Sequence, residues 1–293
     1  MKRLFRRALF ALFLVIAGLA VAGWFVRGRL RARPSWYVRP TLDVETRAAA
    51  ANSMDQKLIG TWNAAVRAHA DEIRARRAVP ATLPATATAA PADPIVLQAT
   101  EDEINASFNK WKATAGWNGG MGKYLSDPIL ILEDHTIILA ATVVLKQMEP
   151  VVSLHFTPRL ENDKLLMGLS RVTVGTLPVP KSYFGGEVKA MTSAMEEKLP
   201  EWREGAHISP RGWADTAAMQ AAMAELLINA LSDLPADPVL FLPEPRGGRD
   251  LRYLPVQIIG IEIADKTLTL TVVPMDADRR ETLLQHIRGP LSE

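Results

Sequence analysis

The feature that most constrains this chain is an uncharged apolar run near its N-terminus, residues 8–26. The run is about 19 residues long, close to the roughly 20 that an α-helix needs to cross the hydrocarbon core of a bilayer. Basic segments flank it on both sides, MKRLFRR before and RGRLRAR after, and such side chains hold their charge in the headgroup region. The sequence therefore predicts a transmembrane helix over residues 8–26.

Two sets of side chains would fix this helix in the bilayer. The lipid-facing set is Leu9, Phe10, Leu12, Phe13, Leu14, Val15, Ile16, Leu19, Trp24 and Phe25. The set expected to face anionic headgroups is Lys2, Arg3, Arg6, Arg7, Arg27, Arg29, Arg31 and Arg33. A tryptophan near the end of the run is typical of the membrane interface.

The same segment also fits a cleaved secretory signal, with Ala20-Val21-Ala22 as a small-x-small cleavage site. The apolar run continues past that site through Trp24-Phe25-Val26, which favours an uncleaved anchor. Basic residues are balanced across the run, so charge alone does not orient it. We expect the N-terminus inside and the C-terminal domain outside the cytoplasm, because long C-terminal domains translocate largely regardless of charge.

Composition excludes several classes of protein. The chain of 293 residues has no cysteine, which excludes disulfides, thiolate metal sites and cysteine nucleophiles. The formal net charge is +2, but residues 1–40 hold basic residues and no acid, so the remainder is mildly acidic. A mildly acidic body argues against binding of nucleic acid.

The pattern along the chain divides it into four parts. Residues 1–40 form the anchor, and residues 41–77 show the apolar period of a helix next to the membrane. This helix would pack on its own domain or, alternatively, lie on the membrane or pair with a second copy. Residues 78–94, AVPATLPATATAAPADP, are typical of a semi-rigid linker holding the domain away from the bilayer. Residues 95–293 would form the extracytoplasmic domain.

Within this domain, alternating apolar residues predict three hairpins. The first joins 129–132 to 136–145, the second joins 151–158 to 165–174, and the third joins 256–264 to 267–274. Residues 129–145 are apolar on both faces, so we expect the first hairpin to be central or covered by a helix.

Helical stretches are expected at 100–111, 186–199 and 213–234. The first opens with a capping box formed by Thr100 and Glu103. The third opens at Ser209-Pro210 and carries a stripe expected in the core. The stripe is Met219, Met223, Leu226, Leu227, Ala230 and Leu231.

No motif nominates a catalytic, cofactor or metal site. The glycine-rich segment 116–123 lacks the spacing of a phosphate-binding loop, and no G-x-S-x-G elbow is present. The five histidines are far apart in sequence, although His135 and His155 could meet in space. Ser170 lies within a predicted strand and is expected to be structural. A pair of catalytic carboxylates distant in sequence stays open.

One family resemblance follows from the order of short motifs. TEDEIN (Thr100–Asn105) opens the first helix, strand pairs follow, and the second pair leads into GTLPVP (Gly175–Pro180). Residues 97–274 resemble in this order the YpmS-like bacterial membrane-anchored proteins and, more loosely, the LmeA-like envelope proteins. The resemblance implies a role with lipids or envelope polymers and transfers no catalytic residue.

These observations predict an α+β fold, with an anchor followed by a curved, mainly antiparallel sheet of about six strands packed against helices. The leading functional hypothesis is a non-enzymatic, membrane-tethered extracytoplasmic domain that binds a lipid or another apolar envelope component. The alternative is a structural or assembly subunit of a membrane complex, with self-association or a partner bound through residues 41–77. An envelope glycan or lipid hydrolase is the least favoured class.

Overall fold

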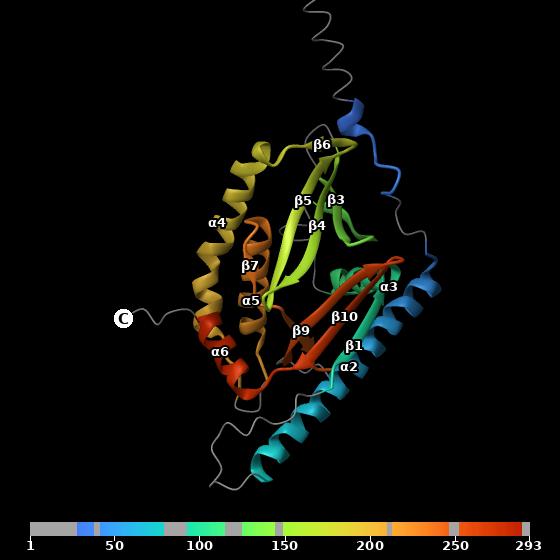
Figure 1. Ribbon diagram of the computed structural model, residues 1–293. Coiled ribbons are helices and arrows are strands. Elements are labelled where there is room, and N and C mark those ends of the chain that lie inside the picture. The colour runs from blue at the N-terminus through green and yellow to red at the C-terminus, as the bar shows by residue number, and fades with distance from the viewer. Residues whose placement is uncertain are drawn as a thin grey trace, which may run out of the picture.

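The computed structural model describes residues 28–37, 42–78, 93–114, 125–143, 149–209, 213–245 and 252–288. In these residues the chain is an α+β protein, with ten strands in two antiparallel sheets and helices around them (Figure 1). The α+β class and the antiparallel pairing are confirmed. The strands lie in two sheets, however, and not in the single sheet of about six that we predicted.

Sheet A has four strands and carries a long helix. Its order is β1 (Ile95–Thr100), β10 (Thr267–Pro274), β9 (Tyr253–Ala264) and β8 (Val239–Pro243). The helix is α2 (Val44–Ala78), which contacts all four strands.

The α2 helix is fixed to sheet A by its apolar side. Trp62 and Ala65 are 7% and 0% exposed and pack among the core side chains of sheet A. Trp62 also stacks on Trp213, with 5.0 Å between the ring centroids. A helix is thus present where residues 41–77 predict one, and it packs on its own domain.

The Ala/Pro/Thr segment has a different place from the one we expected. Residues 79–92 lie outside the described residues, but α2 and β1, the elements that they join, contact each other. The segment therefore connects two parts of one folded unit. It does not lie between the N-terminal run and this unit, so it does not set their distance.

Sheet B contains the first two predicted hairpins. Its order is β2 (Leu125–Glu133), β3 (Thr136–Val143), β4 (Val151–Glu161), β5 (Lys164–Val174) and β6 (Leu177–Val179), with β7 (Pro235–Ala236) paired to the start of β5.

The turns that join the predicted strands explain the registers of the second and third hairpins. Asn162-Asp163 and Asp265-Lys266 have positive φ at both residues, between 49° and 58°. Two such residues make a tight turn whose twist matches that of the flanking strands. All three hairpins are confirmed, with β9 and β10 forming the third.

Three helices lie together on one side of sheet B (Figure 1). They are α4 (Lys181–Gly205), α5 (Thr216–Leu231) and α6 (Ala277–Arg288). The α5 helix begins after Asp215, whose carboxylate accepts a hydrogen bond from the Ala218 backbone N–H at 2.8 Å, and not at Ser209-Pro210.

The buried side of α5 differs in part from our prediction. Its buried residues are mostly alanines, with Ala218 and Ala221 both 0% exposed, together with Ile228. Of the predicted core stripe, Ala230 is buried and Met219 and Leu231 pack on core clusters, whereas Met223 and Leu227 are 43% and 42% exposed. Alanine lets neighbouring helices approach closely, so packing with α4 and α6 places alanines on the buried side and leaves Met223 and Leu227 outside it.

Candidate functional site

The two faces of sheet B are covered to very different extents. Successive side chains of a strand point to opposite faces, so each strand contributes to both. We call one face the covered face; its apolar residues are no more than 9% exposed, and Trp36 and Tyr37 pack on it. These apolar residues are Ile129, Ile131, Ile138, Ala140 and Val151.

The residues that follow the N-terminal run hold this cover in place. The Tyr37 hydroxyl donates to the Asp127 carbonyl at 2.7 Å and lies 3.0 Å from the Thr142 hydroxyl. The backbone N–H of Thr176 donates to the Arg29 carbonyl at 3.1 Å. Gly175 has a φ of 59°, and a Cβ there would overlap the Arg29 carbonyl oxygen. Residues 28–37, which we call the N-terminal strap, are therefore docked at the end of β5.

The covered face also contains a serine–histidine pair. Ser153 Oγ lies 3.0 Å from His155 Nε2 and 2.6 Å from Thr173 Oγ1, and the Trp36 ring meets the His155 ring edge-on. Burial, together with the positive charge of Arg171, lowers the pKa of His155. Because Ser153 is 0% exposed, this pair is a hydrogen-bond network within the sheet and has no access to a substrate.

The TEDEIN segment joins the two sheets. It begins α3 (Glu101–Thr114), which follows β1 of sheet A and lies against β2, the edge strand of sheet B. The Asn105 side chain donates to the Leu130 carbonyl at 2.7 Å and accepts from the Leu130 N–H at 2.8 Å. Glu101 accepts from the Leu132 N–H at 2.9 Å. These side chains complete the backbone hydrogen bonds of β2, so their role is structural.

Glu103 makes the predicted capping box and one further link. Its carboxylate accepts from the Thr100 N–H at 2.8 Å, and the Thr100 hydroxyl accepts from the Glu103 N–H at 3.3 Å. It also accepts from Ser53 and Lys57 of α2, at 2.6 and 2.7 Å. Burial alone would raise the pKa of Glu103, but the hydrogen bonds from Lys57 and Ser53 outweigh it and lower the pKa to about 2. The capping box is confirmed, and it locks α2 to α3.

The opposite face of sheet B, which we call the open face, carries three cross-strand rows of apolar side chains. The first row is Leu132, Ile137, Phe156 and Leu169. The second row is Leu130, Leu139, Leu154, Val172 and Val179. The third row is Ala141, Val152, Val174 and Leu177. None of these thirteen side chains has a polar atom.

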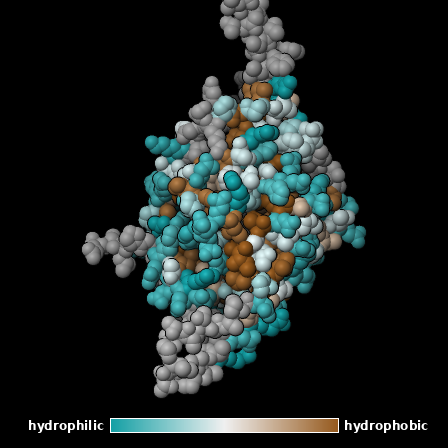
Figure 2. Space-filling view, in the orientation of Figure 1, coloured by the Kyte–Doolittle hydropathy of each residue, from teal (hydrophilic) through white to brown (hydrophobic). Residues whose placement is uncertain are grey.

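The first row of the open face is more buried than the second and third rows. Ala230 and Leu231 of α5 pack near the first row, where Phe156 and Leu169 are each 4% exposed. In the second row Leu139 is 38% exposed. Every residue of the third row is half-buried. Figure 2 shows hydrophobic patches near the middle of the molecule, among hydrophilic surface.

The prediction for residues 129–145 is confirmed in part. Their two apolar faces predicted a hairpin that is central or helix-covered. β3 is an inner strand and α3 lies against β2, but β2 is an edge strand and Leu139 of β3 is 38% exposed. An apolar sheet face that the described residues leave partly uncovered is a candidate binding surface.

A hollow lies between α5, α6 and β8, apart from the open face of sheet B. It has about 400 Å³ of empty space, part of it open solvent, and its apolar lining includes Leu226, Phe241 and Ile287. Two carboxylates converge at its rim on His286 Nε2, Glu225 at 2.5 Å and Asp237 at 3.9 Å.

This convergence is the arrangement that a hydrolase would need, but each carboxylate already has a cationic partner. Glu225 lies 3.5 Å from Arg203 of α4, and Asp237 pairs with Lys164 of β5. This network of ion pairs joins α4, α5, α6 and β5. Each of the two carboxylates forms an ion pair within it, which gives both a structural role.

The structure describes only part of the predicted anchor. All the predicted lipid-facing residues, together with Lys2, Arg3, Arg6, Arg7 and Arg27, lie outside the described residues. Arg29, Arg31 and Arg33 are described and are exposed, on the N-terminal strap. None of the described helices is long and apolar enough to cross a membrane.

The described histidines do not assemble into a metal site. Among the described residues no three His, Asp or Glu side chains are placed to hold a metal ion. His135 lies in the exposed β2–β3 turn and His155 is buried in β4. Ser170, expected to be structural, donates its hydroxyl to the His155 carbonyl at 3.0 Å.

Comparison with protein-family models, with curated proteins and with solved structures finds no match to this chain. Its function is therefore argued from the geometry described above.

Proposed function

We propose that this protein is a single-pass membrane-anchored protein whose extracytoplasmic domain binds a lipid or another apolar envelope component on the open face of sheet B. The main observation behind this proposal is that the two faces of sheet B are covered to different extents. One face of the sheet is sealed by the N-terminal strap, while the other offers rows of apolar side chains with Leu139 38% exposed. The role is binding, not catalysis.

The chemistry of the open face favours an apolar ligand. A glycan or a peptide would need hydrogen-bond partners, and burying its polar groups without them costs several kcal/mol. A methylene chain needs none, and each CH₂ removed from water contributes about 0.8 kcal/mol. Ten buried methylenes would contribute about 8 kcal/mol before the entropy of binding is subtracted.

The anchor places this face beside a source of such molecules. The apolar run of residues 8–26 with its basic flanks supports a transmembrane helix. Arg29 of the docked N-terminal strap lies three residues after the end of the run in sequence. The motif order shared with YpmS-like and LmeA-like proteins points to the same envelope setting.

The test is the apolar content of the purified full-length protein. Protein extracted in a mild detergent and washed extensively should retain an apolar molecule that organic extraction and mass spectrometry detect. Leu139→Asp, on the open face, should reduce that content at least about fivefold, since a charge is strongly disfavoured against an apolar chain.

The matched control for this test is Val96→Asp, because Val96 is 56% exposed on sheet A. The control should keep the wild-type apolar content. A native protein free of apolar molecules, or an equal loss in both variants, would contradict the proposal.

The alternative function, a subunit of a membrane complex, is supported by a different observation. β1 is an edge strand of sheet A, it has no charged residue, and Val96 is exposed on it. Uncharged edge strands are templates for pairing with another chain. Crosslinking in membranes should then capture a partner at β1, and Val96→Asp should abolish the capture while leaving apolar content unchanged.

A further inference from the structure

We infer that the open face takes its ligand directly from the bilayer that anchors the protein, and that the ligand is a membrane phospholipid whose acyl chains reach sheet B across the third row. This inference rests on the proposed function and adds to it the ligand class, the direction of approach and the distance between domain and membrane.

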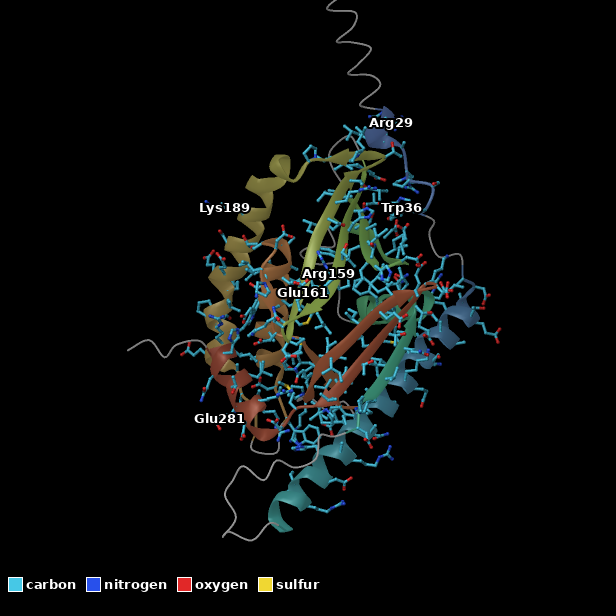
Figure 3. The ribbon with its side chains drawn as sticks, viewed as in Figure 1. Arg29, Trp36, Arg159, Glu161, Lys189 and Glu281 are labelled. Atoms are coloured by element: carbon cyan, nitrogen blue, oxygen red, sulfur yellow. The ribbon has the colours of Figure 1, made fainter. Side chains whose placement is uncertain are left out.

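The third row lies next to the N-terminal strap. Val174 immediately precedes Gly175, whose N–H donates to the Val151 carbonyl at 2.7 Å, and the neighbouring Thr176 binds the Arg29 carbonyl. The third row and the N-terminal strap therefore meet at the same end of sheet B. Figure 3 shows Arg29 at this end and Glu281 of α6 at the opposite end of the molecule.

Only a short length of chain joins the apolar run to the folded domain. The run ends at residue 26, and Arg29, three residues later, accepts a hydrogen bond from the Thr176 N–H at the end of β5. A chain spans at most about 3.6 Å per residue, so this connection holds the end of sheet B within roughly 10 Å of the end of the run. The domain then lies at the membrane surface.

The accessible apolar side chains lie in the second and third rows. The first row is packed near α5, Leu139 of the second row is 38% exposed, and the third row, next to the N-terminal strap, is half-buried throughout. An acyl chain that leaves the bilayer at this end meets the side chains of the third row and then those of the second, none of which has a polar atom.

The N-terminal strap also carries charge. Arg29, Arg31 and Arg33 are exposed on the N-terminal strap, at the end where the acyl chains would enter. Basic residues at a membrane surface attract anionic headgroups, and guanidinium groups match the geometry of phosphate. A headgroup held here would leave its acyl chains beside the third row.

The distance to the membrane is tested with single labels. The chain has no cysteine, so Pro178→Cys and Glu281→Cys each give one labelling site for an environment-sensitive fluorophore. Both positions are exposed, at opposite ends of the molecule. In vesicles of phosphatidylcholine and phosphatidylglycerol carrying a lipid-bound quencher, the label at position 178 should be quenched several-fold more than that at 281. Equal quenching, or stronger quenching at 281, would overturn the membrane-proximal placement.

The ligand and its path are tested with a phospholipid that carries a photoreactive group in its acyl chain. Full-length protein in the same vesicles should form its main crosslinks on β3, β4 and β5, at the second and third rows. Val152→Glu should reduce this yield at least about fivefold, and Val96→Glu should leave it unchanged. Circular dichroism of each variant is the control that it is folded.

The outcomes separate this inference from the proposed function. Crosslinks located mainly in the hollow lined by Phe241 and Ile287, or an effect of Val96→Glu equal to that of Val152→Glu, would overturn the path. Purified protein that retains an apolar molecule other than a phospholipid would overturn the ligand class and leave the proposed function standing. Protein that retains none would overturn both.

Discussion

Ile138 and Leu139 are neighbours in β3, yet Ile138 is 0% exposed and Leu139 is 38% exposed. The first lies on the covered face of sheet B, where the N-terminal strap packs, and the second lies on the open face. Both are large apolar residues of the same strand, and their side chains differ in exposure because successive residues of a strand point to opposite faces. The difference shows that one face of this sheet is packed as core at this position and that the other is left partly exposed.

The largest expected effect comes from placing the same charge on each face of sheet B, which tests whether the two faces differ in their contribution to stability. Ile138→Asp should lower the free energy of unfolding by more than about 4 kcal/mol, because it removes a packed side chain and buries an unpaired carboxylate. Leu139→Asp should lower it by less than about 1 kcal/mol. Urea unfolding of the two variants measures both values. Similar losses would show that the open face is core.

The next largest effect concerns the link between α2 and α3. Glu103→Gln should lower the free energy of unfolding by about 2–3 kcal/mol, because the folded state shifts the pKa from 4.5 to about 2. This contribution is fully present above pH 4.5 and is lost as the pH falls toward 2. Glu161→Gln, at an exposed position, is the matched control and should change stability by less than about 0.5 kcal/mol.

Acid titration of unfolding separates this account from simple loss of packing. The difference between wild type and Glu103→Gln should shrink below pH 4.5, and apolar content should be the same in both proteins at pH 7. A difference that persists to pH 2 would contradict the assigned role of the Glu103 carboxylate.

A smaller effect tests how the N-terminal strap covers its face. Gly175→Ala should lower the free energy of unfolding by about 1–2 kcal/mol, since alanine is strained at a φ of 59° and its Cβ would overlap Arg29. Hydrogen exchange should increase in residues 28–37. Gly186→Ala in α4, where a Cβ meets no atom within 4 Å, should not destabilise the protein. Unchanged exchange in the strap would refute its docking at Gly175.

The smallest effect is the response of the covered face to mild acid. The pKa of His155 is lowered by burial and by Arg171, so the neutral ring is favoured in the folded state. Stability should therefore fall as the pH decreases through 6.5, the ordinary value, toward the lower folded value. His155→Gln should lose this slope, and His135→Gln, in an exposed turn, should keep it. An identical slope in the two variants would exclude His155 as its source.

Features that depend on neighbours in sequence were predictable. The capping box needs only Thr100 and Glu103, and the turns at 162–163 and 265–266 need only residues that tolerate positive φ. Both were confirmed because nothing distant in the chain competes with them.

Features that depend on distant contacts were not predictable. The division into two sheets follows from β1 pairing with β10, from the opposite end of the domain. Asn105 shows no sign in the sequence that it will bind the backbone of Leu130. The α5 stripe was only partly right: Ala230 is buried, but Met223 and Leu227 are exposed, because close helix packing favours Ala218 and Ala221 on the buried side.

The open face lies between these cases. The apolar run of residues 129–145 predicted that both faces of the first hairpin would be apolar, but the extent of cover depends on where the N-terminal strap and α5 pack. The candidate site is thus a place where the apolar pattern of the sequence exceeds what the fold covers.

The central claim, that a ligand occupies the open face, is tested most directly by thiol accessibility in the otherwise cysteine-free chain. Leu139→Cys and Ile138→Cys are each treated with a maleimide, after lipid removal and again after addition of phospholipid. Our account predicts that the thiol at position 139 reacts after lipid removal and is protected by phospholipid, while the thiol at position 138 is unreactive in both states. A thiol at position 139 that reacts equally with and without phospholipid would contradict the account.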